Sequence, residues 1–255
     1  AVDLRGHGQS QPSRGAFSIS DLATDLAGLV ESLELDEPPV LVGHSLGGSV
    51  AQQFVVDYPS KARGVVLLDS DLNGPVALRW AMAVLNRISA WVMRLTGLLL
   101  GQRSLALFQP LLTRLTYSRV WRKSNQGFLA VDGIRFRRNS IRDLAWALTA
   151  WGARPNLTKA MSGLAIPVLA VRGAKDPIVP QFKFRGLTDA IPWAVSATVE
   201  GAGHATILEN PDEIARLVGD FLRQECSARA CTTMTSRASA QIADAAPRLL
   251  SQQIA

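Results

Sequence analysis

The stretch Pro39-Val40-Leu41-Val42-Gly43-His44-Ser45-Leu46-Gly47-Gly48 decides the fold of this chain. Its apolar first half is typical of a short buried β-strand, and residues 49–57 predict a helix that Pro59 ends. Between strand and helix, the pattern G-x-S-x-G is typical of a nucleophile elbow, where a serine occupies a sharp turn. We expect both glycines of the pattern, Gly43 and Gly47, to be required because side chains there would collide.

A serine hydroxyl is a weak nucleophile unless a base takes its proton, and the chain has three histidines to supply one. His44 adjoins the serine, so its side chain should leave the turn in the wrong direction. His7 lies upstream in a glycine-rich loop. His204 follows an apolar strand predicted at residues 194–199 and comes after the serine in the chain. We therefore predict that His204 is the base for Ser45.

A histidine base needs an acid to orient it, and Asp176 is the predicted acid. It follows the apolar run 166–171, typical of a buried strand, and a short turn. Asp69 and Asp71 are alternatives because they follow a second predicted strand at residues 64–68, and Asp71 is the better of the two. Capping of a turn is the structural alternative for Asp176.

Four motifs in this order resemble those of the α/β-hydrolase-fold serine hydrolases. They are a D-x-R-G-x-G-x-S loop at 3–10, the elbow at 43–48, an acid loop at 172–180 and a histidine loop at 201–211. The resemblance implies an α/β fold, with a partial parallel sheet flanked by helices and an inserted helical cap. It also implies Ser45, Asp176 and His204 as a triad in the chain order of that family. The backbone amide of Leu46 would be one oxyanion donor.

The start of the chain departs from the family pattern. In that family, the loop matching residues 3–10 follows about half of the sheet and a His-Gly loop that supplies another oxyanion amide. This chain starts at Ala1. We therefore expect a fragment of a longer protein that lacks its N-terminal strands and a second oxyanion donor. The strand before Gly43 would then lie at an open sheet edge.

Length and composition favour one globular domain with an insertion, because the chain has 255 residues of which 47% are hydrophobic. We expect a hydrolase core at 1–70 and 161–225, a helical cap at 71–160, and a disordered tail at 226–255 that is rich in Ala, Ser and Thr. The two cysteines, Cys226 and Cys231, fall in that tail and predict neither a disulfide framework nor a metal site. We expect no metal and no cofactor, and a cytoplasmic location.

Positive charge is concentrated in the middle of the chain. The net charge is +6, but residues 71–160 carry fourteen Lys and Arg against three acidic residues. The same segment holds five tryptophans. Basic and aromatic residues together can indicate nucleic-acid binding. No recognition motif accompanies them, so we do not expect a nucleic-acid partner.

Residues 78–101 form an apolar segment that is interrupted by basic residues. Arg79, Arg87 and Arg94 recur at helical spacing on one face, and three charges argue against a transmembrane span. We expect a cap helix with its apolar face on the core and its arginines in water. The alternatives are a basic amphipathic helix in weak contact with an anionic membrane surface, or a lid that gates an apolar substrate.

The predicted function is hydrolysis of an ester or related acyl bond in a small apolar substrate, through an acyl-enzyme intermediate. Serine at the nucleophile position disfavours the dehalogenase and epoxide-hydrolase branches of the family, which use aspartate there. Carbon–carbon bond hydrolases, perhydrolases and acyltransferases share the triad and remain alternatives. A different alternative is a non-catalytic protein that binds a small apolar ligand under the cap. Neither the substrate nor the oligomeric state follows from the motifs.

Overall fold

The computed structural model describes residues 1–72 and 76–224, without the side chains of 76–79. The chain divides into two compact units, Ala1–Pro211 and a second that begins at Asp212. In the second unit, the described residues 212–224 are helical. The tail expected at 226–255, with Cys226 and Cys231, lies outside the described residues, as does the side chain of Arg79.

The described part of the first unit contains a four-stranded parallel sheet in the order β1-β2-β3-β4. The strands are β1 Val40–His44, β2 Gly64–Leu68, β3 Val168–Gly173 and β4 Val195–Val199. Every residue of β2 and β3 is buried, whereas β1 and β4 carry exposed residues. All four strands were predicted from apolar runs, but β3 begins two residues later than the run at 166–171. The parallel sheet flanked by helices is confirmed.

Two helices show how local sequence fixes the element ends. Helix α1, Ile19–Ser32, begins with a capping box, because the amide of Asp21 donates to Ser18 Oγ at 3.1 Å and the amide of Ser18 donates to Asp21 Oδ2 at 2.8 Å. Helix α2, Leu46–Asp57, starts three residues before the predicted helix at 49–57 and ends before Pro59, as predicted. Both helices pack on the sheet through one apolar core that includes Leu22 and Phe54, each 0% exposed.

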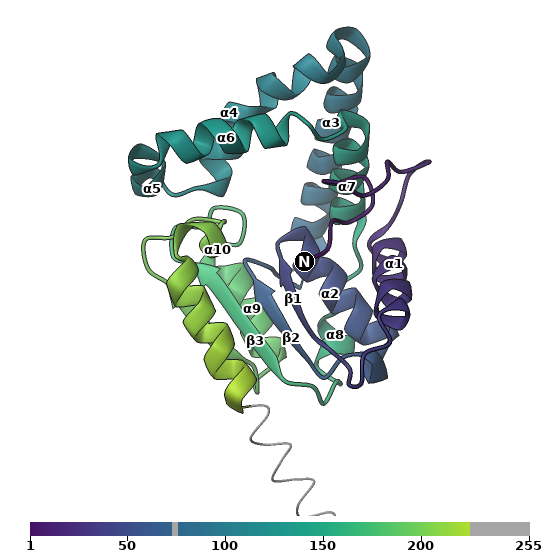
Figure 1. Ribbon diagram of the computed structural model, residues 1–255, viewed down its shortest axis with the longest axis vertical. Coiled ribbons are helices and arrows are strands. Elements are labelled where there is room, and N and C mark those ends of the chain that lie inside the picture. The colour runs from purple at the N-terminus through teal and green to yellow at the C-terminus, as the bar shows by residue number, and fades with distance from the viewer. Residues whose placement is uncertain (73–75, 225–255) are drawn as a thin grey trace, which may run out of the picture. The chain divides into compact units, whose positions relative to one another are not determined.

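A helical insertion occupies the chain between β2 and β3. It consists of α3 Val76–Leu100, η2 Gly101–Ser104, α4 Leu105–Thr116, α5 Arg119–Ser124, α6 Gln126–Phe136, α7 Ile141–Ala153 and α8 Thr158–Met161. After β3 come α9 Gln181–Ala190 and, following β4, the short helix α10 Thr206–Glu209. Figure 1 shows α3 and α7 side by side, and α4 to α6 reaching across toward the part of the molecule that contains α10.

Helix α3 does not pack as the sequence predicts. Its buried residues, among them Ala90 and Met93, form a narrow seam against α7. Close approach is allowed by small residues, since a Cβ on Gly97 would lie 2.9 Å from Ile141. The expected burial of the apolar face on the core is therefore wrong, because this seam uses one side of the helix and leaves large apolar side chains in solvent.

Candidate active site

Ser45 occupies the sharp turn between β1 and α2, with φ 51° and ψ −114°. A positive φ is strained for a residue with a side chain, and it persists where the surroundings enforce it. Gly43 makes the turn sterically feasible, because a Cβ there would lie 2.4 Å from the carbonyl oxygen of Gly47. The expected requirement for Gly47 is wrong, since a Cβ at that position meets nothing within 4 Å. Gly48 is the second constrained glycine, where a Cβ would lie 1.9 Å from Ser70 Oγ.

The structure brings three of the candidate side chains into one hydrogen-bonded chain. Ser45 Oγ lies 2.8 Å from His204 Nε2, and His204 Nδ1 lies 2.8 Å from Asp176 Oδ2. His204 and Asp176 are buried, with 5% and 4% of their surfaces exposed. This is the geometry in which an imidazole can take a proton from a serine while a carboxylate holds its other ring nitrogen.

The loop after β3 fixes the carboxylate of Asp176. Its Oδ1 accepts hydrogen bonds from the amides of Ile178 at 2.7 Å and Val179 at 3.0 Å. These two bonds occupy one oxygen and leave Oδ2 facing the imidazole. The turn-capping alternative for Asp176 and its contact with His204 are therefore both present, one on each oxygen.

The alternative acids are engaged elsewhere. Asp69 accepts from the amide of Gly173 at 2.9 Å and from the hydroxyl of Thr206 at 2.6 Å, so it ties the end of β2 to the end of β3 and the start of α10. Asp71 is buried in an ion pair with Arg154 and lies 3.3 Å from Lys183 Nζ.

His44 faces away from the serine hydroxyl, toward the backbone of the histidine loop. Its Nε2 lies 2.6 Å from the carbonyl oxygen of His204 and 3.4 Å from Asp69 Oδ2. Burial acts to lower the pKa of His44. The hydrogen bond and charge of Asp69, together with the His204 carbonyl and the charge of Asp176, raise it, so the pKa lies above its ordinary value. His7 is elsewhere, with Nδ1 3.0 Å from the carbonyl oxygen of Arg5.

The amide of Leu46 is the first of helix α2, so it has no partner within the helix. It follows Ser45 directly, at the helix end where the backbone dipole favours negative charge. That is the place where an amide can stabilise an oxyanion formed at the serine.

Sequence reasoning missed the residues that hold the histidine loop to the helical insertion. The amides of His204 and Ala205 donate to the carbonyl oxygen of Thr116 at 2.8 and 3.0 Å. The carboxylate of Glu209 accepts from Gly203 at 2.9 Å and from Ser118 at 3.1 Å. These contacts join segments about ninety positions apart, and no local pattern signals them.

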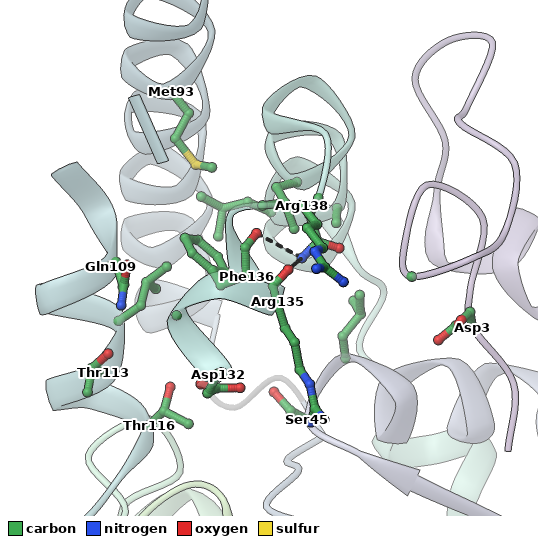
Figure 2. Close-up of a pocket in the computed structure, with 18 of the residues that line it drawn as sticks. Asp3, Ser45, Met93, Gln109, Thr113, Thr116, Asp132, Arg135, Phe136 and Arg138 are labelled. Carbon is green, nitrogen blue, oxygen red and sulfur yellow. Dashed lines mark hydrogen bonds between the residues drawn. The ribbon is translucent and has the colours of Figure 1, made fainter. Parts of the chain in front are cut away.

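A cavity of about 840 Å³ opens beside Ser45, between the sheet side and the insertion. Much of its wall is apolar, with Leu46, Met93, Phe136, Leu144, Leu148 and Trp151 among the lining residues. Its polar lining includes Asp3, Asp132, Arg135 and Arg138. Figure 2 shows the side chain of Arg135 extending from α6 toward Ser45, with Asp3 at the right of the view.

Tyr117 lines this cavity and contacts two neighbouring side chains. Its ring stacks on Trp121 with centroids 4.9 Å apart, and its hydroxyl donates to Asp132 Oδ2 at 3.0 Å. Burial raises the pKa of Tyr117, and the charge of Asp132 raises it further, so the phenol stays protonated as a donor. The carboxylate of Asp132 thus has a partner within the protein.

Comparison with known proteins agrees with this fold. Residues 1–217 match the model of the alpha/beta hydrolase family. The chain is 28% identical to 2-(acetamidomethylene)succinate hydrolase of Mesorhizobium japonicum, over 87% of this chain and 77% of that protein. It is 26% identical to pimeloyl-[acyl-carrier protein] methyl ester esterase of Yersinia pseudotuberculosis, over 88% and 82% of the two chains.

A solved structure has the same fold. A thermophilic esterase from Thermogutta terrifontis superimposes with a TM-score of 0.77 at 24% identity, covering 88% of this chain and 78% of that one. The chain belongs to the alpha/beta hydrolase family. It is an enzyme of the hydrolase type.

Proposed function

We propose that this chain is a serine hydrolase that cleaves a carboxylic ester through an acyl-enzyme intermediate. The single observation that carries the proposal is the hydrogen-bonded chain from Ser45 Oγ through the ring of His204 to Asp176, with 2.8 Å at each step. The esterase relative at 26% identity supports an ester as the substrate class. A serine, a base and an orienting acid are what acyl transfer requires.

In the proposed mechanism, Ser45 Oγ attacks the ester carbonyl carbon while its proton passes to His204 Nε2. The tetrahedral oxyanion accepts a hydrogen bond from the amide of Leu46. The intermediate collapses when His204 returns that proton to the leaving alkoxide, so an alcohol departs and the acyl group stays on Ser45. Water then attacks the acyl-enzyme with His204 again as base, which releases a carboxylic acid and the free serine.

Asp176 keeps the imidazole in the tautomer that this mechanism needs. Its Oδ2 accepts the Nδ1 proton of His204, so Nε2 is left as the acceptor facing Ser45. The amides of Ile178 and Val179 hold the carboxylate in place during both proton transfers.

We propose that helices α3 to α7 act as a cap over this site, and that the hydrolase core is formed by residues 1–70 and 161–225. Residues of α4, α6 and α7 line the cavity that Ser45 also lines. An apolar cavity of about 840 Å³ is within the range that suits a small organic ligand. The substrate is therefore a small ester with an apolar portion.

The proposal is tested by following p-nitrophenyl acetate hydrolysis and the mass of the protein in the same reaction. We expect turnover, and an acetyl adduct on Ser45 when the reaction is quenched with acid. Ser45→Ala should abolish both, while Ser196→Ala, on β4, should change neither. Turnover that survives in Ser45→Ala would refute the proposed nucleophile.

A further inference from the structure

The two arginines that line the cavity differ from the two acidic residues there in their hydrogen-bond partners. Asp132 accepts a hydrogen bond from Tyr117, and Asp3 accepts one from the amide of Gln9 at 2.9 Å. Within the described residues, the guanidinium groups of Arg135 and Arg138 have neither an ion-pair partner nor a hydrogen-bond acceptor. The two carboxylates of the cavity thus already accept hydrogen bonds from the protein, whereas the two guanidinium groups can donate to a ligand.

The side chain of Arg135 points toward the proposed nucleophile. It lies in the last turn of α6, where it lines the same cavity as Ser45, and Figure 2 shows its side chain reaching toward the serine. Arg137, two residues on, instead donates to Gln109 and does not line the cavity. A guanidinium group binds a carboxylate through parallel hydrogen bonds, with both charge and geometry matched.

We infer that Arg135 forms a subsite for a carboxylate, so that the preferred substrate is an ester whose acyl chain also carries a carboxylate group. This inference rests on the proposed serine hydrolase activity and specifies its substrate class. The apolar wall receives the methylene chain, and Arg135 fixes the charged end while Ser45 attacks the ester carbonyl. Charge-assisted hydrogen bonds of this kind discriminate against an uncharged analogue, which leaves the guanidinium without its partner.

The test compares two esters of equal length with the same leaving group, monomethyl glutarate and methyl pentanoate. We expect the wild-type chain to show the larger kcat/KM on monomethyl glutarate. Arg135→Gln should lower that kcat/KM by about 10- to 100-fold, mainly through KM, with a much smaller change for methyl pentanoate. Arg135→Lys should restore part of the preference, and Arg137→Gln is the matched control that should leave both esters unaffected.

The outcomes separate this inference from the proposed activity. Hydrolysis of p-nitrophenyl acetate without a preference for monomethyl glutarate overturns the carboxylate subsite and leaves the serine hydrolase standing. An equal loss on both methyl esters in Arg135→Gln also overturns the subsite. No hydrolysis of any of the three esters overturns both proposals.

A second, independent observation concerns the outer face of α3. Trp80, Val84, Ile88, Trp91, Leu95, Leu98 and Leu99 fall on one side of the helix, and their exposed fractions run from 40% to 83%. The seam of Ala90 and Met93 lies on the other side, against α7. We call these seven residues the outer apolar face. A contiguous exposed apolar surface of this kind marks an interaction site.

The charged residues of α3 and α4 are all positive. No acidic residue occurs between Asp71 and Asp132, whereas this interval contains eight Lys and Arg. Arg87, Arg103 and Arg114, on or next to α3 and α4, are exposed. A second copy of the chain would bring the same positive charge to the contact, so charge repulsion opposes self-association through this face.

A lipid surface fits both properties of the outer apolar face. Among the described helices, one apolar run, Trp80–Thr116, is long and apolar enough to cross a membrane by length and composition alone, and 17% of its apolar window is buried. Arg87 and Arg94 interrupt α3, and charges are costly at the bilayer centre, so a position in the membrane interface is favoured over a span. Tryptophan beside basic residues is typical of helices that lie in that interface.

We propose that the outer apolar face of α3 binds the surface of anionic lipid bilayers. Trp80, Trp91 and Leu98 enter the boundary between headgroups and acyl chains, and the exposed Arg87 contacts the headgroups. Met93 lies on the opposite side of the helix and lines the cavity. Lipid bound to the outer apolar face would therefore not contact this part of the cavity wall.

Sedimentation with vesicles tests this proposal on the full chain. We expect binding to phosphatidylglycerol-containing vesicles, weaker binding at high salt, and little binding to phosphatidylcholine alone. The triple variant Trp91→Gln, Leu95→Gln, Leu98→Gln should bind at least about 10-fold less. The matched control is Val120→Gln with Phe182→Gln, which changes residues that are 77% and 60% exposed elsewhere and should bind as wild type.

Two results would overturn membrane binding. One is a wild-type chain that stays in solution with both kinds of vesicle. The other is a wild-type dimer in the absence of lipid that the triple variant converts to a monomer, since a second copy would then cover the face.

Discussion

Glu209 and Ser118 form a hydrogen bond between the histidine loop and the helical insertion, with the Ser118 amide 3.1 Å from Glu209 Oε2. The other carboxylate oxygen accepts from the amide of Gly203, which precedes His204. Glu209 is 8% exposed, so both bonds are shielded from water. The position of the proposed base is thereby linked to the α4–α5 junction as well as to the sheet.

Removing this carboxylate should displace His204 without altering its chemistry. In Glu209→Ala, two buried amides lose their acceptor, which costs about 1–3 kcal/mol of unfolding free energy for each unsatisfied group. A small displacement of the base should lower kcat by about 10- to 100-fold. Glu209→Gln keeps an acceptor oxygen and should retain more activity. Glu213→Ala, at an exposed surface ion pair, is the control, and steady-state kinetics with urea unfolding give both quantities.

Substitution by asparagine should affect kcat at one candidate acid and stability at the other. Asp176→Asn should lower kcat by about 10⁴-fold with the fold intact, because the imidazole tautomer is no longer held. Asp71→Asn should leave kcat nearly unchanged but lower stability, because Arg154 and Lys183 lose a buried charge. Esterase kinetics and thermal melting of both variants check this. The reverse pattern would move the orienting acid to the end of β2.

Two glycines of the elbow should respond differently to a single added methyl group. Gly43→Ala places a Cβ against the backbone of Gly47 and should prevent the turn from forming, which would be seen as loss of activity together with a lowered unfolding midpoint. Gly47→Ala has free space and replaces glycine inside a helix, so it should be neutral or stabilising by up to about 1 kcal/mol. Equal effects from the two substitutions would contradict this account of the turn.

The raised pKa of His44 predicts a specific pH dependence of stability. Burial lowers this pKa, and the hydrogen bond and charge of Asp69, with the His204 carbonyl and the charge of Asp176, raise it above its ordinary value. The folded state therefore binds the proton more tightly than the unfolded state, whose histidine pKa is about 6.5. The resulting stabilisation is complete below that value and is lost as pH rises through the folded pKa.

Unfolding free energies of wild type and His44→Gln, compared between about pH 6 and pH 8, measure this contribution. We expect the difference between the two proteins to shrink as pH rises. Asp69→Asn should lower the pKa of His44, as followed by NMR titration of its ring protons. A difference that grows with pH would show that the carboxylate of Asp69 does not control this histidine.

Sequence reasoning reached the elements whose signals are local. The strand before Gly43 follows from a continuous apolar run, and the end of the next helix follows from the position of Pro59. The parallel sheet was implied by the resemblance to the family. Ser45, Asp176 and His204 were predicted because each follows a strand and because their order in the chain matches that of the family. The structure brings these three side chains within hydrogen-bonding distance.

Features that depend on distant partners were not predictable in the same way. The packing of α3 is set by α7, which lies some fifty residues later in the chain, and the apolar pattern of α3 alone does not reveal which side meets that partner. Glu209 looks like an ordinary helix residue, because its role depends on the amide of Ser118. The open guanidinium group of Arg135 could not be predicted, because it depends on the partners that Asp3 and Asp132 have in the folded chain.

The central claim is that His204 activates Ser45 for attack, and a fluorophosphonate probe tests it most directly because it reacts with activated serines. Peptide mapping after labelling of the folded chain should place the adduct on Ser45. His204→Ala should reduce the labelling rate by several orders of magnitude, while His7→Ala should label as wild type. Adducts spread over other serines, or undiminished labelling of Ser45 in His204→Ala, would contradict the claim.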